Sequence, residues 1–181
     1  ILVAHGPKRY AGHWELYTER ADGAFAVYLP GNKPAVIRSD RVITDGAWHH
    51  VAMVLDGKRI RLFVDSALVR EAPQNRILPK DRTAPALAVG ALVERGLRCA
   101  GVIDQVRISS TPRPPSVSSA APAKTDESTV RLWDFETWDS ETVFDAAAPT
   151  VPARALALQY GKTQAAVPGT RRRTVPQVEP F

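Results

Sequence analysis

The sequence has little cysteine and no long apolar stretch. Its single cysteine, Cys99, excludes a disulfide within the chain, but does not fix the compartment, because many exported domains contain no disulfide. No segment approaches the roughly 20 apolar residues that a membrane-spanning helix needs. Residues 1–5 lack the basic region and apolar core of a signal peptide, and the chain does not begin with Met. We therefore expect no membrane span, and we expect an excised part of a longer protein.

Helical periodicity is almost absent too, and nothing in the chain alternates strand with helix as a parallel α/β fold would. Short apolar–polar alternations are separated by turn residues instead. Residues 13–19 and 25–29 are predicted to form a hairpin around Asp22 and Gly23, because this dipeptide tolerates positive φ. Further strands are predicted at residues 87–93, 102–109 and 129–135.

A second hairpin is the best-supported local structure. Residues 48–55 are apolar on both faces, which predicts a central strand that is covered on both sides. A turn at residues 56–58 leads into residues 59–65, where Ile60, Leu62 and Val64 share one face while Arg59, Arg61 and Phe63 take the other. Several short strands with turns between them favour an antiparallel β-sandwich.

The distribution of charge argues against one class of partner. Lys and Arg outnumber Asp and Glu by 24 to 19, for a net charge of +5. Most of these basic residues alternate with apolar residues on predicted strands, as on a solvated sheet face, and only residues 171–173 form a basic run. A nucleic-acid binder concentrates basic residues on one element, so we expect no nucleic-acid partner.

Two segments carry a family resemblance. Asp45–Asp65 contains D-G-A-W-H-H-V-A, a turn and then F-V-D, and it resembles laminin-G-like and pentraxin-like domains of the concanavalin A-like superfamily. Gly101–Ser109, G-V-I-D-Q-V-R-I-S, resembles a later strand of the same family. The resemblance covers residues 1–110 and implies an all-β, antiparallel jelly-roll β-sandwich. Ser66 departs from it, because the family has Gly in that turn.

The resemblance also implies two strands ahead of Ile1. Residues 130–136, V-R-L-W-D-F-E, resemble that family opening instead. Either the chain spans parts of two tandem modules, or residues 129–136 fold back onto the vacant sheet edge; we favour the second, since an unpaired edge invites aggregation. The predicted organisation is a laminin-G-like sandwich at 1–110, a Pro/Ser/Ala linker at 111–125, a returning segment or the start of a second module at 126–160, and an irregular basic tail at 161–181.

The sequence gives little support for a catalytic site or for a transition-metal site. The superfamily includes glucanases, whose E-x-D-x-x-E strand places three acids on one face, but the nearest string, residues 134–141, has a different spacing. We expect no catalytic residue. Adjacent His49 and His50 would point to opposite faces of a strand and could not jointly hold one ion. We expect a structural pair, with one ring packed in the core beside Trp48.

Calcium is the better metal candidate, because the resemblance implies a calcium site at the rim of the sandwich. Carboxylates and backbone carbonyls are the ligands that this cation prefers. The candidates on predicted turns are Asp22, Asp45 and Asp104. Between the two, we favour the interpretation that these are solvated turn acids, since Asp is common in turns.

Sugar recognition needs exposed aromatic rings and planar polar groups on a sheet surface. The candidate ligand-binding residues are Tyr17, Tyr28, Arg38, Arg59 and Arg61. Trp14 is expected to face the core.

We interpret the chain as a non-catalytic module that recognises carbohydrate or another extracellular ligand, such as a protein. The resemblance places it in a larger exported protein (extracellular, periplasmic or at the cell surface), where the other domains of the parent are further partners. The alternative is a structural module that packs against an attached enzyme domain and positions it, and a glycoside hydrolase is third.

Overall fold

The computed structural model describes residues 1–77, 86–94, 96–112, 115, 124–135, 142–144 and 152–154. Within these ranges the chain forms strands and no helix, so none of the described segments is a helix that could cross a membrane. All strand pairs there are antiparallel. The predicted all-β, antiparallel class is confirmed.

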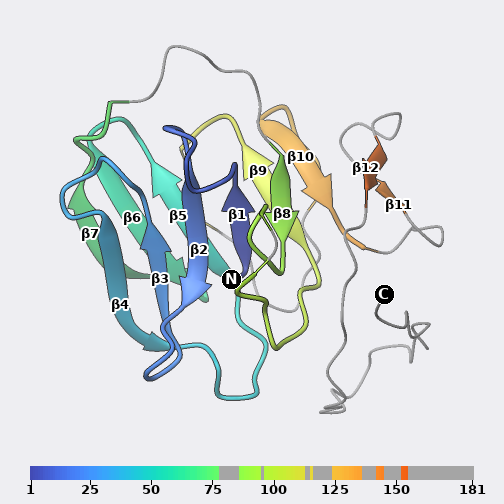
Figure 1. The fold of residues 1–181 in the computed structure, drawn as a ribbon, viewed down its shortest axis with the longest axis horizontal. Coiled ribbons are helices and arrows are strands. Elements are labelled where there is room, and N and C mark those ends of the chain that lie inside the picture. The colour runs from blue at the N-terminus through green and yellow to red at the C-terminus, as the bar shows by residue number, and fades with distance from the viewer. Residues whose placement is uncertain are drawn as a thin grey trace.

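The larger sheet has five strands in the order β4-β3-β2-β1-β8 (Figure 1). They are β1 (Val3–His5), β2 (Trp14–Thr18), β3 (Ala24–Tyr28), β4 (Val36–Val42) and β8 (Leu87–Val89). The predicted first hairpin is present: Leu16 lies opposite Val27, and Gly23 turns the chain with a φ of +74°. A positive φ suits a residue without Cβ.

The smaller sheet has three strands in the order β5-β6-β7. They are β5 (Val51–Leu55), β6 (Arg59–Val64) and β7 (Ala67–Pro73). The predicted second hairpin is also present, with Met53 opposite Leu62 and Gly57 at a φ of +87°.

The predicted place of the strand at 48–55 is wrong. Among the described strands β5 pairs only with β6, and β6 is the central strand. The side chains of β5 are half-buried, and Trp48 is 45% exposed rather than packed in the core beside a histidine. Apolar residues on both faces could not reveal this, because folded proteins leave many apolar side chains at the surface.

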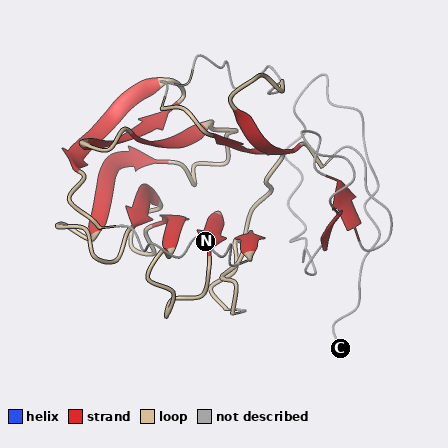
Figure 2. Ribbon diagram, turned by 90° about the horizontal axis from the view of Figure 1, so that it is seen from above, coloured by secondary structure: helices blue, strands red, loops and turns tan. Residues whose placement is uncertain are grey.

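The core lies between these two sheets, which form two layers in Figure 2. Each sheet contributes alternate side chains from its inward face, as the period of two in a strand requires. The buried members are Phe25, Val27, Leu29 and Ile37 from the larger sheet, and Ile60, Leu62, Val64 and Ala72 from the smaller one. Trp14 packs against this core, as predicted.

A third pairing joins β9 (Val106–Ser109) to β10 (Thr129–Trp133), with Trp133 opposite Val106 (Figure 1). Leu132 of β10 is 3% exposed. This pairing returns residues 129–133 to a strand of the first 110 residues, but the described strands place the pair in a two-stranded sheet of its own rather than at the edge of either larger sheet. The fold-back hypothesis and the domain boundaries given above stay predictions. The remaining strands, β11 (Thr142–Phe144) and β12 (Pro152–Arg154), pair with each other. The acidic string beyond Phe135 up to residue 141 and the basic run at 171–173 lie outside the described residues.

Candidate functional site

Three of the five predicted ligand-binding residues lie on the outward face of the larger sheet. In β2 and β3 the residues Leu16 and Val27 point into the core, so Tyr17 and Tyr28 point outward. Arg38 of β4 is paired with Ala26, which in turn is paired with Tyr17. Tyr17 and Arg38 are therefore two strand spacings apart, roughly 10 Å. We call the surface formed by Tyr17, Tyr28 and Arg38, around the buried Ala26, the tyrosine face.

The polar groups of the tyrosine face have local partners that fix their positions. The hydroxyl of Tyr17 donates to Glu19 Oε1 at 3.0 Å, and burial together with this carboxylate raises the pKa of Tyr17 well above its ordinary value. Arg38 pairs with Asp22. The ring of Tyr28 meets His13 edge-on, with the ring centres 6.0 Å apart. Ala26 is fully buried among its longer neighbours.

Arg59 and Arg61 lie elsewhere, on the outward face of β6 in the other sheet. Arg61 Nη1 is 2.7 Å from Asp56 Oδ2, and both arginines pair with Glu71, at 3.1 and 2.8 Å. Backbone N–H groups of Arg59 and Lys58, with Arg61, lower the pKa of Asp56 to about 2. The structure thus separates these two arginines from the tyrosine face and binds them into an ion-pair network.

The three predicted calcium ligands do not form one cluster. Asp22 accepts the Ala24 N–H and pairs with Arg38, and Asp45 accepts the Ala47 N–H at 2.9 Å. Asp104 is exposed in the segment before β9. Across the described ranges, no three His, Cys, Asp or Glu side chains are placed to hold a metal ion. These carboxylates do not fit a shared calcium site, and calcium binding stays a prediction.

His49 lies between two carboxylates at one end of the smaller sheet. Its Nδ1 is 2.8 Å from Asp65 Oδ2, and its Nε2 is 3.0 Å from Asp45 Oδ1. Burial opposes protonation of the ring, but the two carboxylates outweigh it and raise the pKa of His49. In turn, the Ala47 N–H and His49 lower the pKa of Asp45. Asp65 also accepts the N–H of His50 at 2.9 Å, so this cluster ties the start of β5 to the end of β6.

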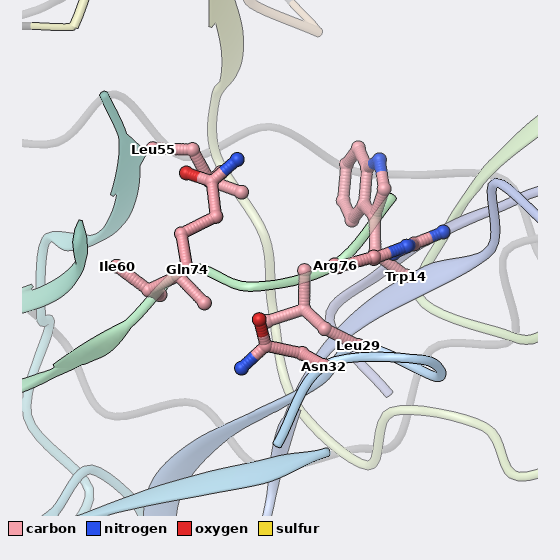
Figure 3. Close-up of a pocket in the computed structure, with 7 residues that line it drawn as sticks. All are labelled: Trp14, Leu29, Asn32, Leu55, Ile60, Gln74 and Arg76. Carbon is pink, nitrogen blue, oxygen red and sulfur yellow. The ribbon is translucent and has the colours of Figure 1, made fainter. Parts of the chain in front are cut away.

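A cavity of about 330 Å³ opens at the end of the sandwich (Figure 3). We call it the end pocket. Its apolar wall comes from both sheets and its polar rim from the loops that follow β3 and β7. The lining residues are Trp14, Leu29, Asn32, Leu55, Ile60, Gln74 and Arg76. In Figure 3 Trp14, Leu29 and Arg76 lie on one side of it, and Leu55, Ile60 and Gln74 on the other.

The rim of the end pocket is held by hydrogen bonds. Asn32 Nδ2 donates to the carbonyls of Pro34 and Pro73, at 2.9 and 3.1 Å. Gln74 Oε1 accepts the N–H of Gly57 at 3.1 Å. The opposite wall is fixed as well, because Trp14 stacks on His5 with ring centres 5.4 Å apart.

Arg76 donates from its two Nη groups to the carbonyls of His13 and Ala11, at 2.8 and 2.6 Å. Sequence analysis did not single out Asn32, Gln74 or Arg76. No local pattern marks them, since the pocket forms only when the two sheets stack.

Comparison with known protein families agrees with the fold. A family model described as the concanavalin A-like lectin/glucanases superfamily, laminin G type, matches residues 2–116. No curated protein and no solved structure matches the chain. Laminin-G-like domains are generally non-catalytic ligand-binding modules of multidomain proteins, typically extracellular, although the superfamily includes glycoside hydrolases. The match covers more than half of the chain, and the chain belongs to the laminin-G-like family of the concanavalin A-like superfamily.

Proposed function

We propose that the chain is a non-catalytic carbohydrate-binding module and that the tyrosine face is its ligand site. The observation that supports this most directly is the strand register that brings Tyr17, Tyr28 and Arg38 to one outward face. The parent would be a larger exported protein in which the module acts beside other domains.

The chemistry of the tyrosine face suits a sugar. A tyrosine ring can cover the apolar face of a pyranose, while nearby polar groups exchange hydrogen bonds with its hydroxyls. The Tyr17–Glu19 and Arg38–Asp22 pairs present donors and acceptors side by side. Because both pairs are already fixed, binding costs little additional side-chain entropy.

Hydrolysis fits the described residues poorly. A glycosidase needs two carboxyl groups that flank an accessible glycosidic bond, about 5–9.5 Å apart. Among the described acids only Glu15 is buried, and it lies 2.7 Å from Nε2 of the fully buried His13. No Asp or Glu is among the described residues that line the end pocket. The accessible acids that lie near one another, Asp45 with Asp65 and Asp56 with Glu71, are engaged by His49 and by Arg61. We therefore propose binding rather than hydrolysis.

A glycan array, printed once with calcium and once with a chelator, tests the proposal on the full chain. Arg38→Gln and Arg61→Gln form a matched pair, because each removes one arginine with a carboxylate partner, but from opposite sheets. We expect Arg38→Gln to weaken binding about tenfold, the typical loss of one charged hydrogen bond, and Arg61→Gln to leave it unchanged.

Other results of these binding measurements, or of a hydrolysis assay, would point to a different site or function. The reverse pattern would move the site to the smaller sheet with Arg59 and Arg61. Binding that vanishes with the chelator would establish a calcium site. No binding on either array would contradict the proposal and favour a structural module that positions a neighbouring domain. Release of reducing sugar from β-glucans would establish a hydrolase.

A further inference from the structure

We propose that the end pocket is a second ligand site, which binds a small organic acid with an apolar aryl or alkyl body and a single carboxylate. This inference is independent of the tyrosine face, because the two sites share no residue. It depends on the apolar wall of the cavity and on one arginine at its rim.

The apolar wall of the end pocket favours a ligand whose main part is apolar. Leu29 and Ile60 are buried at 1% and 0% exposure, and Leu55 and the Trp14 ring complete the wall. Such a surface offers few partners to sugar hydroxyls, and an unpartnered hydroxyl costs free energy on burial. The volume of about 330 Å³ lies near the lower limit of ligand pockets, about 300–1,000 Å³, which favours a ligand of one ring.

Arg76 determines which charge the ligand should carry. Its guanidinium has five N–H donors, and the partners of its Nη groups are the neutral carbonyls of His13 and Ala11. Its Nε is buried without a hydrogen-bond partner. No carboxylate of the described ranges forms an ion pair with Arg76, whereas the arginines at positions 38, 59 and 107 each pair with one and Arg61 pairs with two.

An unbalanced cation at the mouth of an apolar cavity favours an anion. Burial lowers the pKa of Arg76, which reflects the cost of holding its charge away from water. A carboxylate would offset that cost by accepting the two Nη N–H bonds that the carbonyls of His13 and Ala11 leave over. The side-chain NH₂ of Gln74, whose oxygen is held by Gly57, offers a further donor.

The geometry also fixes the orientation of the ligand. Arg76 reaches the backbone of His13, the residue before Trp14, so the charged group lies at the Trp14 side of the pocket (Figure 3). The apolar body would then extend along the indole toward Leu29 and Ile60.

Calorimetric titration of the full chain with 3-phenylpropionate and with its neutral amide tests this inference. The two probes share one body and differ in charge. We expect the carboxylate to bind about 10- to 100-fold tighter, the range of a hydrogen bond to a charged group. NMR shifts of the Trp14 indole should locate both probes in the end pocket.

Variants separate this explanation from general electrostatics. Arg76→Gln should remove the preference for the carboxylate, while Arg61→Gln, with the same change in charge, should retain it. Leu55→Trp, which places a much larger ring against the wall of the cavity, should weaken the binding of both probes, and it keeps the inference testable if Arg76→Gln does not fold.

Equal binding of the two probes, a preference that survives Arg76→Gln, or no binding of either probe would overturn the inference. Each of these results leaves the proposal for the tyrosine face untouched.

Discussion

Replacement of Leu132 by alanine tests whether β10 belongs to the folded module. β10 lies beyond residues 2–116, the part matched by the family model. Leu132 is 3% exposed, and such Leu→Ala changes cost about 2–5 kcal/mol of the free energy of unfolding. Within the described residues β10 has one neighbouring strand, β9, so its surroundings can partly close around the lost side chain. We expect a loss of about 2–3 kcal/mol, or roughly 6–15 °C in Tm.

Urea unfolding, followed by circular dichroism, measures this loss. Val130→Ala is the matched control, because Val130 lies in the same strand and is 42% exposed; it should cost less than about 1 kcal/mol. Truncation after residue 123 should destabilise the chain at least as much as Leu132→Ala. If both point variants unfold at the same urea concentration, β10 contributes no core, and the chain is better explained as parts of two tandem modules.

Two further predictions concern the His49 cluster and the turn beside it. The pKa of His49 is raised in the folded state, so the stability that its protonated ring supplies is complete below its ordinary value of 6.5 and is lost as pH rises through the folded value. Asp45 and Asp65 have lowered pKa values, and their contribution is present above 3.8 and lost as pH falls through the folded values. His49→Gln should therefore lower Tm most near pH 5 and least above pH 8; an equal loss at both would contradict this. Ser66 has a φ of +68°, which costs a side chain about 1 kcal/mol, so Ser66→Gly should raise the free energy of urea unfolding by about that amount. Asp65 also has a positive φ, +50°. Asp65→Gly should nevertheless lower the free energy of urea unfolding, because the carboxylate that holds His49 is lost.

Local chemistry was sufficient to predict both hairpins. Gly23 and Gly57 occupy positive φ at the turns, and the alternation on either side decides which residues face the core. These signals lie within a few residues of each other along the chain. Tertiary packing therefore did not need to be known to pair residues 13–19 with 25–29 and residues 48–55 with 59–65, whereas the register, such as Leu16 opposite Val27 and Met53 opposite Leu62, came from the structure.

What could not be predicted depends on how the hairpins stack. Alternation predicts that Arg61 faces outward, but it does not show that Arg38 and Arg61, both candidate ligand-binding residues, belong to different sheets. The end pocket depends on long-range order too, because Asn32 and Gln74 come from loops about 40 residues apart and meet only through contacts such as that of Asn32 with Pro73. The edge position of β5 was missed for the same reason.

The motif that carries the family resemblance has a structural explanation in this fold. Within Asp45–Asp65, the two terminal carboxylates hold the His49 ring, and they also accept the backbone N–H groups of Ala47 and His50. These bonds close the end of the smaller sheet, so this part of the motif has a structural role in joining a strand pair. In our proposals, recognition depends on the tyrosine face, which lies outside the motif, and on the end pocket, to which the motif contributes only Leu55 and Ile60 of the apolar wall. A protein that shares the motif but lacks a tyrosine at position 17 and an arginine at position 76 should keep this sandwich and bind neither ligand, and a structure of such a protein with either ligand bound at these positions would refute that separation.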